Sequence, residues 1–175
     1  TRKTPTSTPR KPDSNPPDFP RVNPEDPYTN TYLGKISVSF RDEKGLERPA
    51  LLYIPKTEKS AWNMVLVLIP GGREPEEFFQ EGNFENILEK YCMTGFFLGA
   101  PQGWQREEPG YELDTAVRAL EIMQSNRYFQ SNYPAIYCMG FEDAAWVASL
   151  FAVTHTSILA AWSAKGDSSL PQELL

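Results

Sequence analysis

The 175-residue sequence has few cysteines, one histidine and no long apolar run. Its two cysteines, Cys92 and Cys138, are too few for a disulfide framework and are not spaced as metal ligands. Cys138 lies in an apolar stretch, where a free cysteine is usually a small buried hydrophobe. No apolar run approaches the roughly 18 residues of a membrane-spanning helix, so we expect no membrane span.

Basic residues are also scarce, with 17 Lys and Arg against 23 Asp and Glu, for a net charge of −6. The charges are scattered and form no basic stripe, so nucleic acid is not an expected partner. Glu74, Glu76 and Glu77 lie close together, but acidic residues are common in a first helical turn and no His or further Asp converges on them. We therefore predict no metal and no cofactor.

The first thirty residues contain half of the sixteen prolines, mixed with Thr, Ser, Asp and basic residues. Such a composition buries too little apolar surface to offset the entropy cost of ordering. This predicts a disordered arm or linker over residues 1–30 and a globular domain over 31–175. A Thr- and Pro-rich arm often follows a removed secretion signal, which favours an extracellular or cell-surface location.

The remaining sequence alternates predicted strands with predicted helices. Alternating apolar residues at 35–40, a charged turn at Gly45 and the segment 50–54 predict an antiparallel hairpin. Apolar runs typical of buried parallel strands follow at 64–69, 95–100, 135–139 and 158–163.

Helical spacing is found between these runs. It extends from Pro75 to Tyr91, where Gly82 can break it, in a helix opened by Asp114, and over residues 144–153. The alternation predicts an α/β fold with a doubly wound, mostly parallel sheet and an N-terminal antiparallel hairpin.

The segment 140–144, Gly-Phe-Glu-Asp-Ala, joins the third of these apolar strands to a helix. A strand, a sharp turn with small residues and an immediate helix form the setting of a nucleophile elbow, usually GxSxG. The strained turn holds the central side chain clear of the sheet, near backbone N–H groups that can hold an oxyanion. Gly140 and Ala144 stand at the small positions, and Glu142 stands at the centre.

From about Tyr32 to Ser163 the chain resembles the N-terminal part of α/β-hydrolases of the polyhydroxybutyrate-depolymerase, feruloyl-esterase and esterase D-like group. Four matching features occur in the order and spacing of that group: the oxyanion turn at 68–73, the Pro-containing turn at 99–103, the helix opening at Asp114 and the elbow at 140–146. The resemblance implies an α/β-hydrolase fold, and it places Gly71, Gly72 and Asp143 as the oxyanion-turn equivalents.

Three departures from the family pattern argue against catalysis. Glu142 replaces the nucleophilic Ser, and Pro70 replaces the His of the oxyanion turn. The family's triad acid and base lie on later strands, of which this chain has too few. The only histidine, His155, is predicted at the far end of the post-elbow helix, where it cannot reach position 142. We therefore expect that the chain by itself is not a working serine hydrolase.

The predicted sheet is incomplete compared with this family. The segment 158–163 would be an exposed apolar edge, which invites pairing with another strand. We therefore expect a second polypeptide to complete the sheet, either the other product of a cleaved precursor or another copy.

These observations favour a degenerate hydrolase, a pseudoenzyme that acts as a binding or scaffold module. One alternative is an esterase-like hydrolase, active only when assembled, in which Glu142 replaces the usual Ser as nucleophile or general base. Another is an assembly subunit whose edge strand and Pro-rich arm make the contacts. Arg73 and Trp104 follow strand ends, where ligands bind in open α/β sheets, and are the candidate ligand contacts.

Overall fold

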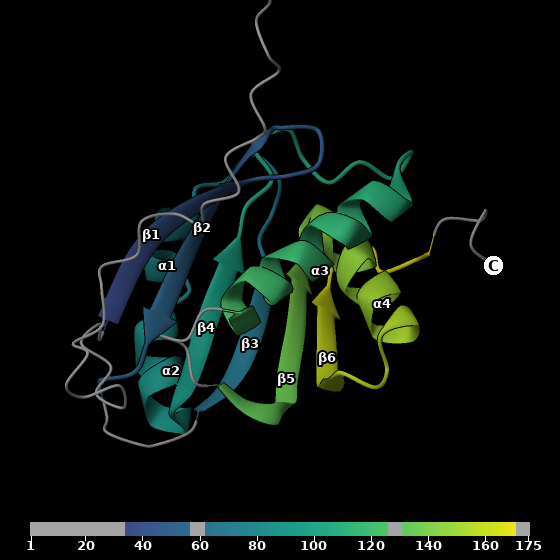
Figure 1. The fold of residues 1–175 in the computed structure, drawn as a ribbon. Coiled ribbons are helices and arrows are strands. Elements are labelled where there is room, and N and C mark those ends of the chain that lie inside the picture. The colour runs from purple at the N-terminus through teal and green to yellow at the C-terminus, as the bar shows by residue number, and fades with distance from the viewer. Residues whose placement is uncertain (1–33, 57–61, 126–130, 171–175) are drawn as a thin grey trace, which may run out of the picture.

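The computed structural model describes residues 34–56, 62–125 and 131–170, in which one six-stranded sheet is covered by helices on both faces (Figure 1). The predicted arm over residues 1–30 lies outside the described residues. The order across the sheet is β1-β2-β4-β3-β5-β6. The strands are β1 (Gly34–Arg41), β2 (Glu47–Ile54), β3 (Trp62–Leu68), β4 (Met93–Leu98), β5 (Ser131–Phe141) and β6 (Leu159–Lys165).

The sheet combines an antiparallel N-terminal part with a parallel remainder. β1 and β2 form the predicted hairpin, and β2 also pairs antiparallel with β4. β4, β3, β5 and β6 run parallel to one another, which confirms the four predicted parallel strands. The central residues of β3 and β4 are buried on both faces, because helices cover each side of the sheet.

Two helices cover each face. α3 (Pro109–Ser125) and α4 (Ala145–Thr154) pack on one face with residues such as Leu66 and Cys138, whereas α1 (Pro75–Glu81) and α2 (Phe84–Tyr91) pack on the other with Val67 and Phe97 (Figure 1). The doubly wound α/β prediction is therefore confirmed. The break between α1 and α2 lies at Gly82 and Asn83, as predicted, and Asn83 adopts a left-handed φ of 52°.

The predicted start of the third helix was wrong. α3 begins at Pro109, so Asp114 lies exposed within the helix and neither caps nor opens it. Proline is favoured at the first helical position because its φ is already helical and its missing N–H costs no bond there. The helix therefore starts one turn earlier, and this start brings Tyr111 and Glu112 over the sheet.

β6 lies at the edge of the described sheet and is mostly exposed. It pairs with β5 on one side, and within the described residues no strand pairs with its other side. Trp162 of this strand is 48% exposed, which is unusual for so large an apolar side chain. The predicted exposed edge is thus present in the structure.

Cys138 is a buried residue of β5, as predicted, and burial raises the pKa of its thiol to about 12. A thiol with so high a pKa stays protonated near neutral pH and is a poor nucleophile. Among the described helices, none has the length and apolar character needed to cross a membrane.

Candidate functional site

The turn between β5 and α4 has the geometry of a nucleophile elbow. Glu142, at its centre, has a φ of 52° in the left-handed region and an exposed side chain. A Cβ on Gly140 would lie 2.6 Å from the Ala144 carbonyl oxygen and 2.7 Å from the Cβ of Ala148. Only glycine therefore lets α4 pass this close to β5, which is the role of the first small residue in GxSxG.

The strain at Glu142 is not explained by local sequence preference. A left-handed φ costs a non-glycine residue roughly 1–2 kcal/mol, so the surrounding packing must impose it. Part of this packing comes from Gly166, just after β6, whose backbone lies directly against Glu142. A Cβ added to Gly166 would lie 2.5 Å from the Glu142 carbonyl oxygen. The elbow backbone is thus retained, although its central side chain is a carboxylate and not a hydroxyl.

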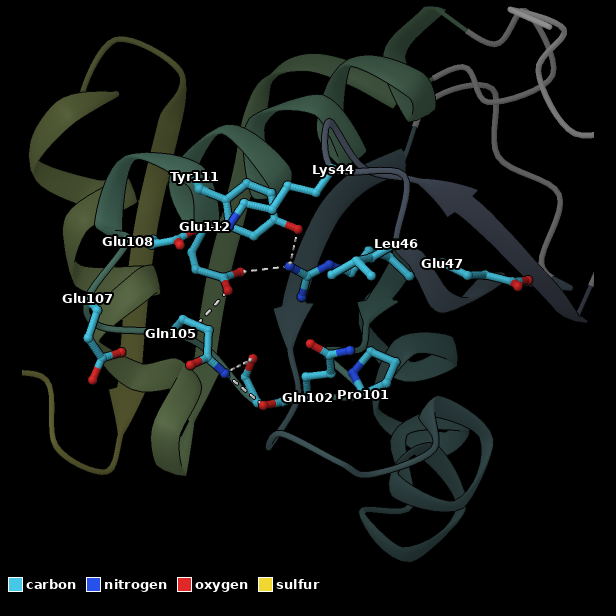
Figure 2. Close-up of a pocket in the computed structure, with 12 residues that line it drawn as sticks. Lys44, Leu46, Glu47, Pro101, Gln102, Gln105, Glu107, Glu108, Tyr111 and Glu112 are labelled. Atoms are coloured by element: carbon cyan, nitrogen blue, oxygen red, sulfur yellow. Dashed lines mark hydrogen bonds and ion pairs between the residues drawn. The ribbon is translucent and has the colours of Figure 1, made fainter. Parts of the chain in front are cut away.

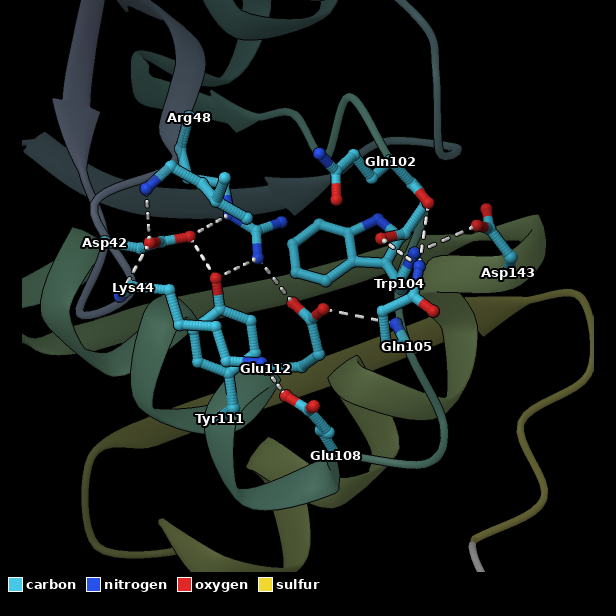
Figure 3. Close-up of polar contacts among 12 residues, drawn as sticks. Asp42, Lys44, Arg48, Gln102, Trp104, Gln105, Glu108, Tyr111, Glu112 and Asp143 are labelled. Carbon is cyan, nitrogen blue, oxygen red and sulfur yellow. Dashed lines mark hydrogen bonds and ion pairs between the residues drawn. The ribbon is translucent and has the colours of Figure 1, made fainter.

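The neighbouring carboxylate, Asp143, bonds to two loops that follow other strands. Its Oδ1 accepts a hydrogen bond from the Gly71 N–H at 2.8 Å. Its Oδ2 accepts one from the Trp104 N–H at 3.3 Å (Figure 3). Gly71 follows β3 and Trp104 follows β4, so Asp143 links the carboxyl ends of three strands. The Gly72 N–H donates instead to the Ala100 carbonyl at 2.8 Å.

The two predicted ligand contacts already have partners in the chain. Trp104 is only 5% exposed, and its indole N–H donates to the Ile69 carbonyl at 2.8 Å. The Arg73 guanidinium donates to Glu81 at 2.6 Å and lies over the Phe78 ring. The hydrogen bond that Arg73 donates to Glu81 and the nearby charge of Glu142 help to raise the pKa of Arg73.

His155 lies at the C-terminal cap of α4, where its ring stacks on Phe151. The ten residues of α4 span roughly 15 Å, so the imidazole is a full helix length away from the elbow at the other end. The sequence contains no other histidine. The structure therefore does not bring His155 to the elbow.

A buried ionic cluster lies beside the loop that carries Trp104 (Figure 3). The Arg48 side chain, 4% exposed, donates to Asp42 at 2.8 Å and to Glu112 at 3.1 Å, and both carboxylates are fully buried. Tyr111 donates its hydroxyl proton to Asp42. Glu112 also accepts the Gln105 N–H at 3.1 Å, which attaches the loop after β4 to α3.

The two carboxylates of this cluster have opposite pKa shifts. Burial acts to raise the pKa of Asp42, but hydrogen bonds from Tyr111, Arg48 and the Leu46 N–H outweigh it and lower the pKa. Burial dominates at Glu112 and raises its pKa, despite the bonds from Gln105 and Arg48. One cation therefore serves two buried acids, and Glu112 is the less well compensated of them.

A pocket of about 530 Å³ opens next to this cluster, at the edge of the sheet where the parallel strands end (Figure 2). Its charged groups are largely paired with one another, since Lys44 bonds to Glu108 and Arg48 to Glu112. Its lining residues are Lys44, Leu46, Glu47, Arg48, Pro101, Gln102, Gly103, Gln105, Glu107, Glu108, Tyr111 and Glu112. Gly103 connects the pocket to the elbow, because it lies close to the Asp143 carboxylate.

The assembled site has few groups suited to bond-making chemistry. Glu142 is exposed, Asp143 bonds to backbone N–H groups, and in the described part of the chain no three His, Cys, Asp or Glu side chains converge as metal ligands. The structure thus brings together Glu142, Asp143, Gly71 and Trp104, while His155 stays apart. Sequence reasoning missed the Asp42, Arg48 and Glu112 cluster, because isolated charges 64 residues apart give no local pattern.

Neither a protein-family model nor a curated protein matches this sequence. Solved structures do match the fold. An acetyl xylan esterase from Aspergillus awamori aligns with a TM-score of 0.64 at 12% identity, over 80% of this chain and 56% of that one. FphF, a fluorophosphonate-binding serine hydrolase of Staphylococcus aureus, aligns with a TM-score of 0.59 at 10% identity, over 74% of this chain and 55% of that one.

Est1E from Butyrivibrio proteoclasticus is a further match, with a TM-score of 0.55 at 15% identity, over 72% of this chain and 49% of that one. At such identities the likeness establishes the fold, which is that of the α/β-hydrolases, and leaves activity open. The described chain spans about half the length of these structures. The sheet described here therefore corresponds to part of the complete hydrolase fold.

Proposed function

We propose that this chain is a degenerate α/β-hydrolase, a pseudoenzyme that acts as a binding or scaffold module. The observation that carries the proposal is Glu142, a carboxylate at the strained centre of an elbow where active relatives of the GxSxG type place Ser. The position of His155, a helix length away, supports it further. With an ester substrate, an elbow carboxylate acting as nucleophile would displace the alcohol and form a mixed anhydride, whose hydrolysis still needs an activated water.

Labelling by a fluorophosphonate probe and hydrolysis of p-nitrophenyl acetate test this proposal together. We expect no covalent labelling, because the elbow has no hydroxyl, and ester hydrolysis equal to that of a heat-denatured sample. Glu142→Gln should leave this background unchanged. Glu121→Gln is the matched control, since Glu121 is an exposed carboxylate on α3 away from the elbow.

Ester turnover above background that Glu142→Gln abolishes, and Glu121→Gln does not, would instead establish the esterase-like alternative with Glu142 in a catalytic role. Both measurements should be made on the protein as isolated with any chain that co-purifies with it, because that alternative predicts activity only in the assembled form.

We further propose that another polypeptide segment completes the sheet along β6. Two observations on β6 support this proposal: the strand is mostly exposed, and so is its Trp162 side chain. The proposal is also supported by the length of the chain, which spans about half of each solved structure that it matches. An apolar edge strand is a template for strand addition, whether from the same precursor or from another copy. An extracellular or cell-surface location for the assembly stays a prediction.

Intact mass and size-exclusion light scattering on protein from its native source test this assembly. We expect a co-purifying second chain or a dimer, and Trp162→Lys should weaken the association because it places a charge on the exposed edge. A stable monomer of the 19.8 kDa chain at high concentration would contradict the proposal.

A further inference from the structure

The carboxylate of Asp143 bonds to a backbone N–H in the turn after β3. In α/β-hydrolases the oxyanion hole combines the N–H of the residue after the elbow centre with an N–H from the turn after the third strand. Gly71 follows β3 and is the residue in that turn that points its N–H to the elbow. Here this N–H donates to the chain's own Asp143 at 2.8 Å.

The second bond makes the arrangement a two-point attachment. The other carboxylate oxygen of Asp143 accepts the Trp104 N–H at 3.3 Å, so each oxygen has one backbone donor from a different loop. Trp104 is itself fixed by its buried indole, which bonds to the Ile69 carbonyl at the end of β3. Trp104 therefore has an anchor of its own, and the Gly72 N–H bond to the Ala100 carbonyl at 2.8 Å anchors the turn that carries Gly71.

The Asp143 carboxylate lies close against the backbone of the turn after β3. A Cβ added to Gly71 would lie 2.4 Å from the Gly103 Cα and 2.5 Å from the Asp143 Oδ2, which real Cβ atoms do not tolerate. Gly103, with a φ of 80°, would place a Cβ 3.5 Å from the same oxygen. Glycine at position 71 therefore leaves the room that the Asp143 carboxylate fills, whereas the distance at Gly103 is an ordinary contact.

We propose that Asp143 is an internal anion that fills the oxyanion position, and that the Gly71 and Trp104 N–H groups form a latent site for a small carboxylate. In the native chain a ligand whose oxyanion needs these donors binds only when the Asp143 side chain moves away. This goes beyond the proposed lack of catalysis, since it concerns binding and holds whatever Glu142 does.

The site is tested by removing the Asp143 carboxylate by mutation and supplying formate in its place. Asp143→Ala is expected to lower the folding equilibrium constant about tenfold, because two backbone donors lose a charged acceptor at a partly exposed site. Addition of about 100 mM sodium formate, compared with sodium chloride at equal ionic strength, should recover part of the loss by binding the folded state. In NMR spectra the Gly71 and Trp104 amide protons of this variant should shift on formate addition and saturate.

Glu142→Ala is the matched control. It removes the adjacent carboxylate and the same charge, but Glu142 has no hydrogen bond to either loop among the described contacts, so formate should change neither its stability nor those amides. An equal formate response in wild type, Asp143→Ala and Glu142→Ala would overturn the proposal. So would amide resonances of Gly71 and Trp104 that do not move in Asp143→Ala.

If Asp143→Ala does not fold, the same amides are followed in Asp143→Asn, which keeps the shape and removes the charge. The proposal then requires the Gly71 or Trp104 amide proton to shift relative to wild type, because a carboxylate acceptor polarises an N–H more than an amide does. Unchanged positions of both would overturn it.

Discussion

Replacing the buried Arg48 by methionine is expected to lower the free energy of unfolding by about 3–5 kcal/mol. Arg48 is the one cation that faces both Asp42 and Glu112 in the described cluster, and neither carboxylate has any exposed side-chain surface. Methionine fills similar space but leaves two buried acids without a counter-ion. Urea unfolding of the two proteins at neutral pH measures the difference.

The loss is expected to depend on pH. Without Arg48 the pKa of Glu112, already raised above its ordinary 4.5 by burial, should rise further. A group with a raised folded-state pKa contributes stability that is present below its unfolded pKa and is lost as the pH rises through the folded value. The deficit of Arg48→Met should therefore be smaller at about pH 5 than at about pH 8.

In the wild type the pH dependence of stability that Asp42 contributes has the opposite sign. Its pKa is lowered, so its contribution to stability is lost as the pH falls below the ordinary value of 3.8. Arg73→Met is the control, because the Arg73 and Glu81 pair is largely exposed and is expected to contribute far less to stability than the buried cluster. Equal losses in the two variants, or a deficit that does not change with pH, would show that the buried cluster does not carry the expected charge imbalance.

Gly140→Val is expected to cost about 3 kcal/mol or more and can prevent folding, because overpacking here meets backbone and not only flexible side chains. The new Cβ would lie 2.6 Å from the Ala144 carbonyl oxygen and 3.0 Å from the Ala145 Cα, so α4 would have to move away from β5. Yield, far-UV circular dichroism and urea unfolding of the variant measure the effect.

Gly110→Val makes the same change in α3, where an added Cβ meets nothing within 4 Å. Valine is a slightly better helix former than glycine, so this control should be neutral or stabilising by a few tenths of a kcal/mol. A Gly140→Val protein as stable as Gly110→Val would mean that the close crossing of β5 and α4, and with it the elbow, is absent.

The two predictions concern parts that support one another. The Arg48 cluster anchors the loop after β4 through Gln105, and that loop presents the Trp104 N–H to Asp143. The close crossing of β5 and α4 at Gly140 fixes the position of the Asp143 backbone in the turn between them. Damage to either part should therefore also disturb the latent carboxylate site, and the Trp104 amide resonance is a common reporter for both.

Local sequence patterns were sufficient to predict most helices and strands of this fold. Apolar runs and their spacing located the hairpin, the parallel strands, the break at Gly82 and the elbow at Glu142, because such patterns depend on residues that are near in sequence. The start of α3 was misplaced because Asp114 and Pro109 are both plausible helix starts. The preference of proline for the first helical position and the packing of Tyr111 and Glu112 on the buried cluster favour the earlier one.

What the sequence by itself determined was therefore the α/β fold and the absence of Ser at the elbow. Tertiary structure alone decided which groups Asp143 meets, since its donors lie 72 and 39 residues away. It alone made Arg48 a buried partner of acids in the β1–β2 turn and on α3. The physical reason is that a charged side chain has the same local pattern whether it is solvated or buried. Its partner is chosen only when the strand ends converge, where burial makes an unpaired charge costly.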